Sequence, residues 1–104
     1  MQLYPLKLVT VVGETVIMND IVEEAVDLGA TGYTLSEVAG RGSRNARNVI
    51  DTGGATTMKA EFVVPMDVAE KILIHVSHNY FEHYACIAWL SDVQVVRGQQ
   101  YLRQ

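Results

Sequence analysis

Three arginines fall close together in this chain, and they are the side chains best suited to chemistry. Arg41, Arg44 and Arg47 lie in a stretch that also contains Gly40 and Gly42. A guanidinium group forks onto phosphate oxygens, and Arg44 and Arg47 are three residues apart, so both can converge on one phosphate in a turn or helix. Charge alone leaves open the alternative of a solvated loop that happens to be arginine-rich.

The residues around these arginines also suit an anion. Gly40 and Gly42 lack Cβ atoms, so the backbone can approach a phosphate closely, and successive N–H groups in such a turn can form an anion nest. Ser43 adds a hydroxyl donor. No Gly-Lys-Ser/Thr triplet follows the glycines and no helix is expected to begin there, which excludes a Walker-type loop and a Rossmann turn.

Length and composition predict one soluble domain over residues 1–104. The chain has 104 residues, of which 49% are hydrophobic, and a formal net charge of −4. A negative charge argues against general nucleic-acid binding, which needs a basic face. The single cysteine excludes a disulfide framework and suits a reducing cytosol. No secretory leader and no apolar run of membrane-spanning length is expected, so we predict a cytoplasmic protein.

Apolar residues recur with two different periods along the chain. Short β-branched or alternating runs predict strands, and apolar residues three or four positions apart predict helices. The expected strands are residues 6–12, 32–38, 57–64 and about 85–96. The expected helices carry the apolar stripes Ile17, Ile21, Ala25 and Leu28, and then Ala69, Ile72, Leu73, Val76 and Tyr80.

Particular residues are expected to set the boundaries of these elements. Gly29 stands where a left-handed cap would end the first helix. Pro65 ends the third strand, and Asp67 and Glu70 form a capping-box-like pair at the start of the second helix. The periodicity stops over residues 39–55, which predicts a long loop of the kind that is usually functional.

The order strand, helix, strand, strand, helix, strand is that of the α+β ferredoxin-like fold, βαββαβ. In this plan the helices cover one face of an antiparallel sheet. The other face would be half-apolar and uncovered, and such a surface is an association site. We therefore expect the chain to form oligomers through its sheet.

Two stretches resemble the PII signal-transduction proteins. Residues 29–42, GATGYTLSEVAGRG, are similar to the second strand of that family, and residues 59–65, KAEFVVP, to its third. Residues 40–47, GRGSRNAR, resemble more specifically the SbtB subfamily, the PII-like partners of a sodium-dependent bicarbonate transporter in carbon-concentrating bacteria. Carboxysome-associated PII proteins are a related set. The resemblance covers roughly residues 6–98.

The resemblance implies a homotrimer that binds adenine nucleotides in clefts between neighbouring subunits. AMP, cAMP, ADP and ATP are the candidate effectors, with no obligatory cofactor and no catalytic residue. The long loop, called the T-loop in this family and expected at about residues 41–55, would change shape with the nucleotide and contact a partner. For this subfamily the partner is a membrane bicarbonate transporter, which would bring the protein to the inner face of the plasma membrane.

The resemblance also implies which residues contact the nucleotide. Arg44 and Arg47 are the leading phosphate contacts, and strand residues would hold the purine, largely through backbone groups. For Phe62, alternation favours a place in the core over a side-chain contact with the ligand. The implied set is Gly32, Thr34, Gly40, Arg41, Gly42, Ser43, Arg44, Arg47, Glu61, Phe62, Val63, Cys86 and Ile87.

The sequence departs from the family pattern in two places. Typical PII proteins have a loop with glycine and lysine before the last strand, whereas residues 84–87 contain neither. This departure argues against tight ATP-selective binding and 2-oxoglutarate sensing, and it favours AMP-type ligands. Many SbtB-type proteins end in a two-cysteine loop, but residues 99–104 contain no cysteine. Cys86 itself is expected to be a small buried residue at the start of a strand.

Two other functions fit the same fold. An acylphosphatase-like hydrolase would need a phosphate-cradling loop after the first strand, where residues 13–15 are acidic and lack arginine. A CutA-type metal-tolerance protein would share the architecture without needing residues 40–47. His75, His78 and His83 invite a metal site, but no carboxylate or cysteine completes an obvious ligand set, so exposed or interface histidines are favoured.

Overall fold

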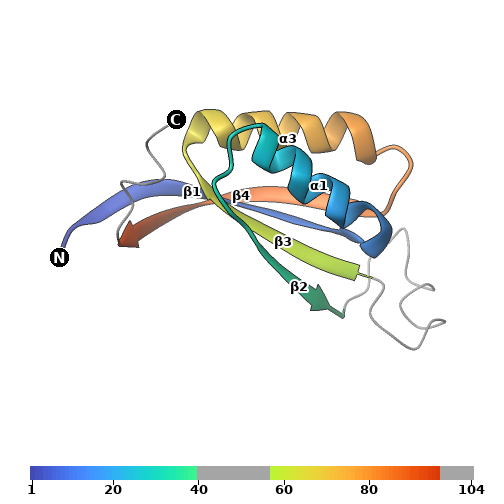
Figure 1. Ribbon diagram of the computed structural model, residues 1–104, viewed down its shortest axis with the longest axis horizontal. Helices are drawn as coiled ribbons and strands as arrows, with labels where there is room; N and C mark the ends of the chain where they lie inside the picture. The colour runs from blue at the N-terminus through green and yellow to red at the C-terminus, as the bar shows by residue number, and fades with distance from the viewer. Residues whose placement is uncertain (40–56, 97–104) are drawn as a thin grey trace.

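The computed structural model describes residues 1–39 and 57–96, in which two helices cover one face of a four-stranded antiparallel sheet (Figure 1). In chain order the elements are β1 Leu3–Glu14, α1 Thr15–Asp27, β2 Thr34–Val38, β3 Thr57–Val64, α3 Met66–Tyr80 and β4 Cys86–Val96. This is the βαββαβ order, so the predicted ferredoxin-like fold is confirmed.

The strands lie in the order β2-β3-β1-β4, which places β1 between β3 and β4. Leu8 of β1 lies opposite Val63 of β3, and Thr34 of β2 lies opposite Glu61 of β3. β1 is longer than the predicted strand at both ends, because its first residues continue the ladder with β4 as far as the pair of Leu3 with Val96.

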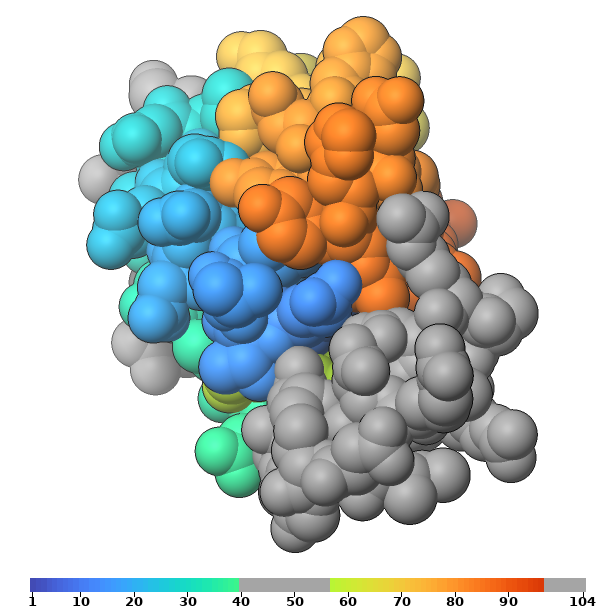
Figure 2. Space-filling view, turned by 90° about the vertical axis from the view of Figure 1, so that its right-hand side faces the viewer, coloured from blue at the N-terminus to red at the C-terminus, as the bar shows by residue number. Residues whose placement is uncertain are grey.

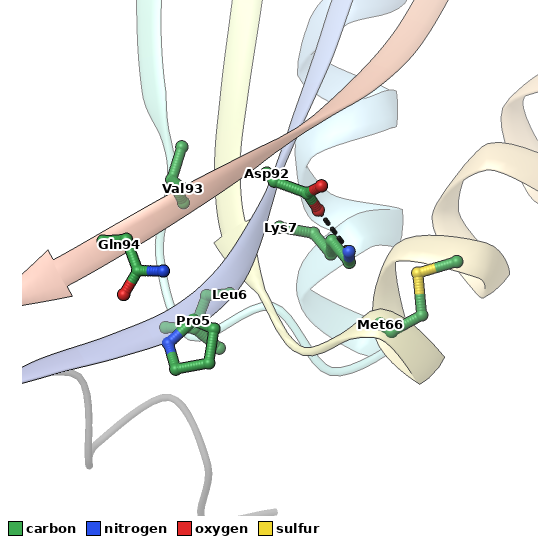
Figure 3. Close-up of a pocket in the computed structure, with 7 residues that line it drawn as sticks. All are labelled: Pro5, Leu6, Lys7, Met66, Asp92, Val93 and Gln94. Carbon is green, nitrogen blue, oxygen red and sulfur yellow. Dashed lines mark hydrogen bonds and ion pairs between the residues drawn. The ribbon is translucent and has the colours of Figure 1, made fainter.

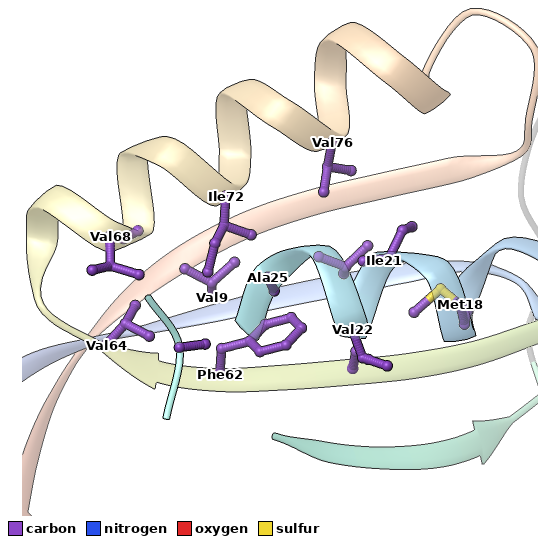
Figure 4. Packing of buried hydrophobic residues seen from close by; sticks show 14 of the residues in the cluster. Val9, Met18, Ile21, Val22, Ala25, Phe62, Val64, Val68, Ile72 and Val76 are labelled. Carbon is purple, nitrogen blue, oxygen red and sulfur yellow. The ribbon is translucent and has the colours of Figure 1, made fainter. Parts of the chain in front are cut away.

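The hydrophobic core lies between the sheet and the two helices (Figure 4). The expected stripes of both helices face it, and Phe62, Val9 and Val11 are fully buried on the side of the sheet that faces the helices. Figure 2 shows α1, in blue to cyan, packed beside α3, in yellow to orange. Among the described residues no helix is both long and apolar enough to cross a membrane.

Element boundaries agree with the sequence at Gly29 and differ from it at the start of α3. Gly29 has φ 125°, in the left-handed region that favours glycine, as predicted. The capping box of Asp67 and Glu70 is wrong, because α3 begins at Met66 with Pro65 as its N-cap and without a side-chain cap. The carbonyl of Pro65 accepts the first helical hydrogen bond from the N–H of Ala69, at 2.9 Å.

The face of the sheet that lies away from the helices, here called the free face, carries large apolar side chains. Because side chains alternate along a strand, Leu8, Val12 and Val63 point to the free face when Val9, Val11 and Phe62 point to the core. Ile87 and Trp89 of β4 also lie on the free face, and they are 58% and 43% exposed. This chain alone therefore leaves a half-apolar sheet surface in contact with water.

Candidate functional site

An open cavity of about 420 Å³ lies where β1, β2 and β3 meet. The ladders bring its walls together, because Thr34 lies opposite Glu61 and Leu8 lies opposite Val63. The cavity is lined by Leu8, Gly32, Tyr33, Thr34, Glu61 and Val63. Four of the residues implied from the sequence therefore line a single cavity, and it opens beside the free face.

Glu61 is the charged member of this lining. Its side chain is half-buried, and its carboxylate has no hydrogen-bond or ion-pair partner among the described residues. A carboxylate repels phosphate and accepts hydrogen bonds from N–H and O–H groups. This cavity consequently suits a neutral, donor-bearing part of a ligand, with Leu8 and Val63 offering apolar contact.

Gly32 leaves open space in the cavity. A Cβ atom added at this position would meet no other atom within 4 Å, and Gly32 has no left-handed backbone angle that would require glycine. The fold of the chain itself therefore does not explain a glycine here. Close approach of a ligand to the backbone would explain it.

Phe62 lies between two cavity residues in sequence but points the other way. Its side chain is 0% exposed and packs in the core between the helices and β3 (Figure 4). Its backbone remains next to those of Glu61 and Val63. The ring of Tyr33 packs against it from the edge of the sheet, with ring centroids 6.4 Å apart.

Cys86 and Ile87 lie on the other edge strand of the sheet, away from the cavity. In the ladder they are opposite Gly13 and Val12 of β1, whereas the cavity lies on the β2 side. Cys86 is a half-buried free thiol, and its burial, followed by the nearby carboxylate of Glu14, raises its pKa to about 11. Within one chain the structure does not bring these two residues to Gly32 and Thr34.

The remaining predicted contacts lie outside the described residues. These are Gly40, Arg41, Gly42, Ser43, Arg44 and Arg47. Charge is distributed unevenly between the two parts of the chain. The described ranges 1–39 and 57–96 hold eleven acidic residues and three lysines, a formal charge of −8, whereas the rest holds one acidic residue and all five arginines, a formal charge of +4.

A second open cavity, of about 580 Å³, lies where β1 and β4 meet the start of α3 (Figure 3). Its charged groups, Lys7 and Asp92, already form an ion pair with each other. None of the residues implied by the sequence lines it. The smaller cavity beside Glu61 is therefore the better candidate for a nucleotide site.

His75 makes two close side-chain contacts, one of them with α1. Within the described residues no group of three or more His, Cys, Asp or Glu side chains could hold a metal ion. His75 Nε2 lies 2.7 Å from Oε1 of Glu24, and its Nδ1 lies 3.1 Å from Nδ2 of Asn79. His78 is exposed at the surface of α3.

Comparison with known proteins identifies the family. The model of the family described as nitrogen regulatory protein P-II matches residues 6–100. This chain belongs to the PII family. A solved PII-like signalling protein from Thermus thermophilus is 40% identical to it, over 97% of this chain and 99% of that chain, with a TM-score of 0.81.

More distant PII structures share the fold. CPII from Thiomonas intermedia, solved with ADP, AMP and acetate, is 22% identical over 97% of this chain and 98% of that chain, with a TM-score of 0.81. CPII solved with ADP, AMP and bicarbonate is 23% identical over 92% and 98% of the two chains, with a TM-score of 0.76. The fold of this PII protein is therefore found with a quite different sequence.

Sequence reasoning missed two cavity residues of this PII protein, Leu8 and Tyr33. Leu8 is one of several apolar residues in β1, so only its position opposite Val63 marks it. Tyr33 had a local signal, because it stands between Gly32 and Thr34, and a cavity lined by both neighbours is lined by its backbone too.

Proposed function

We propose that this PII-family protein senses adenine nucleotides and passes their state to a partner protein, acting by binding and not by catalysis. One observation carries the proposal: Gly32, Thr34, Glu61 and Val63, which the family resemblance implied, line the same cavity. They come from separate segments of the chain, so their meeting depends on the fold.

The cavity would take the base and ribose of the nucleotide. Glu61 can accept hydrogen bonds from an exocyclic amine or a ribose hydroxyl, and Thr34 adds a second polar group. The apolar groups of Leu8 and Val63 suit a purine ring. A phosphate group would be repelled by the Glu61 carboxylate, which has no ion-pair partner among the described residues, and would be held by other residues.

The phosphate would be held by the arginine-rich segment. Arg44 and Arg47 are the proposed direct contacts, with the backbone of Gly40 and Gly42 and the hydroxyl of Ser43 beside them, and Arg41 at the ligand or a partner. The local charge favours this arrangement, because all five arginines of the chain lie outside the strongly acidic described part.

The ligands of a relative support AMP-type effectors. CPII has been solved with ADP and AMP and, in further structures, with bicarbonate as well. We propose AMP and ADP as the leading ligands of this chain, with cAMP and ATP as further candidates. The absence of lysine from residues 84–87 argues against tight binding of the outer phosphates of ATP.

We propose a homotrimer with the free faces of the sheets turned inward. The exposed Ile87 and Trp89 would then be covered, which removes their apolar surface from water. Ile87 and Cys86 lie on the sheet edge opposite the cavity, so they would reach a nucleotide only at the cavity of a neighbouring copy. An inter-subunit cleft is thus the arrangement that unites the predicted contacts.

We further propose an SbtB-type role, the regulation of a sodium-dependent bicarbonate transporter during inorganic carbon acclimation. Residues 41–55 would form the contact with the transporter. The protein would be cytoplasmic and would reach the inner face of the plasma membrane through this partner. The support is the similarity of residues 40–47 to that subfamily.

Calorimetry with AMP, cAMP, ADP and ATP tests the proposal. Wild type should bind at least AMP or ADP, and Arg44→Ala/Arg47→Ala should bind about a hundredfold more weakly, because two charge-assisted contacts are lost. Glu61→Gln, which keeps the shape of the side chain, should weaken binding by about tenfold. Unchanged affinity in both variants would remove the proposed site.

A further inference from the structure

Tyr33 stands between two residues that line the cavity, and it lines the cavity as well. We propose that Tyr33 is a positioning residue for nucleotide binding, an inference that rests on the proposed function. Its ring packs behind the cavity wall and holds the backbone of residues 32 and 33 where the ligand must meet it. Tyr33 does not need to touch the ligand with its ring.

The segment before β2 has little other support. β2 begins only at Thr34, is five residues long and pairs with β3 alone within the described chain. Residues 31–33 have no regular secondary structure and are exposed. Their backbone is therefore not fixed by the ladder of the sheet, and among these three residues Tyr33 makes an aromatic contact with the core.

The ring of Tyr33 provides that contact. Its centroid lies 6.4 Å from that of Phe62, with the ring planes tilted by 57°, a favourable geometry for two aromatic rings. Phe62 is 0% exposed, so the ring pair ties the segment to the interior of the core. Thr34 and Glu61 face the cavity, one residue away from each ring. The ring pair therefore joins the segment before β2 to β3, behind the cavity wall.

The exposure of Tyr33 allows its role in binding to be separated from a role in folding. Its side chain is 51% exposed, so it contributes less to the core than a buried aromatic residue does. Loss of the ring should free residues 32 and 33 to move while the sheet and helices stay folded. The ligand must then order this segment again, and that lowers affinity.

The test compares Tyr33→Ala, Tyr33→Phe and Phe81→Ala by calorimetry with AMP and ADP and by thermal unfolding. Phe81 is a matched control, since it is 39% exposed and follows α3, outside the cavity lining. We expect Tyr33→Ala to bind roughly five- to tenfold more weakly. Tyr33→Phe keeps the ring and should bind like wild type. Phe81→Ala should also bind like wild type, with a melting temperature close to that of Tyr33→Ala.

The outcomes distinguish this inference from the proposed function. A wild type that binds AMP or ADP, together with a Tyr33→Ala variant that binds equally well, overturns the positioning role alone. The same conclusion follows if Tyr33→Phe loses as much affinity as Tyr33→Ala, because the hydroxyl and not the ring would then matter. If wild type binds none of the four adenine nucleotides, both the proposed function and this inference are overturned.

Discussion

The hydroxyl of Tyr80 donates a hydrogen bond of 2.7 Å to Oε1 of Glu24, which joins the last turn of α3 to α1. His75 Nε2 lies 2.7 Å from the same oxygen. One carboxylate oxygen of Glu24 in α1 is thus contacted by two side chains of α3. The two helices lie side by side on the sheet (Figure 2). This polar contact connects them in addition to their apolar packing in the core.

Alkaline pH should weaken this connection. Burial, followed by the hydrogen bond to Glu24, raises the pKa of Tyr80 above its ordinary value. The unfolded chain then releases a proton above about pH 10 that the folded protein keeps, so the free energy of unfolding falls as pH rises from there. Tyr80→Phe removes this group and should cost about 1 kcal/mol at pH 7. Urea unfolding from about pH 7 to about pH 11 should show the gap between the two proteins closing.

Apart from Tyr80, wild type and Tyr80→Phe have the same ionisable side chains, so the comparison isolates the contribution of Tyr80. A gap between wild type and Tyr80→Phe that keeps the same size across this alkaline range would show that the folded state does not hold the Tyr80 proton.

Cys86 should be an unreactive thiol at neutral pH. Its pKa is raised to about 11 by burial and by the carboxylate of Glu14, which is fixed nearby because it accepts the N–H of Ala85 at 2.7 Å. The folded protein at about pH 8 should contain roughly a hundredfold less thiolate than the unfolded chain, and the thiolate is the nucleophile. Alkylation by iodoacetamide, followed by mass spectrometry, should therefore be slower by about that factor than in urea.

Because its pKa is raised, Cys86 should also make the folded protein less stable at alkaline pH. The folded state keeps the thiol proton of Cys86 to higher pH than the unfolded chain. The contribution of this group to the free energy of unfolding is therefore complete below about pH 8.5 and declines as pH rises toward 11.

Equal alkylation rates in native buffer and in urea would contradict the shielded environment of the thiol.

Local patterns were sufficient to predict the elements of this fold, because its helices carry apolar stripes and its strands are short apolar or alternating runs. Alternating residues of β3, from Met58 to Val64, indicated both the strand and its buried face. The true length of β1 escaped prediction, since the pairing of Leu3 with Val96 joins residues at opposite ends of the chain. Nothing within a few residues of Leu3 signals that contact.

The candidate site was less accessible to sequence reasoning than the fold. Gly32, Thr34, Glu61 and Val63 could be implied from family resemblance, but Leu8 enters the cavity only through strand register. A sequence also does not say whether two segments meet within one chain or between copies. Cys86, implied for the same site, lies on the opposite edge of the sheet within one chain.

Two glycines should respond in opposite ways to substitution by alanine. Gly32→Ala adds a methyl group to open space in the cavity, so stability should stay within about 0.5 kcal/mol of wild type. Nucleotide affinity should fall by about tenfold or more, because the methyl group would displace the ligand from close contact with the backbone. Gly29→Ala places a side chain at φ 125° and should cost about 1–2 kcal/mol of stability with little change in affinity.

The two variants are controls for each other in thermal unfolding and in calorimetry with AMP. If Gly32→Ala lowered the melting temperature as much as Gly29→Ala, a structural role for Gly32 would replace the proposed close approach of the ligand.

Assembly should depend on the free face of the sheet and not on the outer face of the helices. Ile87 and Ile74 are almost equally exposed, at 58% and 57%, but Ile87 lies on the free face and Ile74 on α3. Ile87→Asp would bury a charge in the proposed trimer, whereas Ile74→Asp would leave its charge in water. Sedimentation should give wild type and Ile74→Asp three times the chain mass of 11.5 kDa and Ile87→Asp a smaller mass.

Because both variants replace the same residue type by the same charge at matched exposure, a difference between them reports the location of the interface. A trimer that survives Ile87→Asp but dissociates with Ile74→Asp would mean that the helices form the interface. Cys86 and Ile87 would then have no route to the cavity of a neighbouring copy, and the nucleotide site would have to be built from one chain alone.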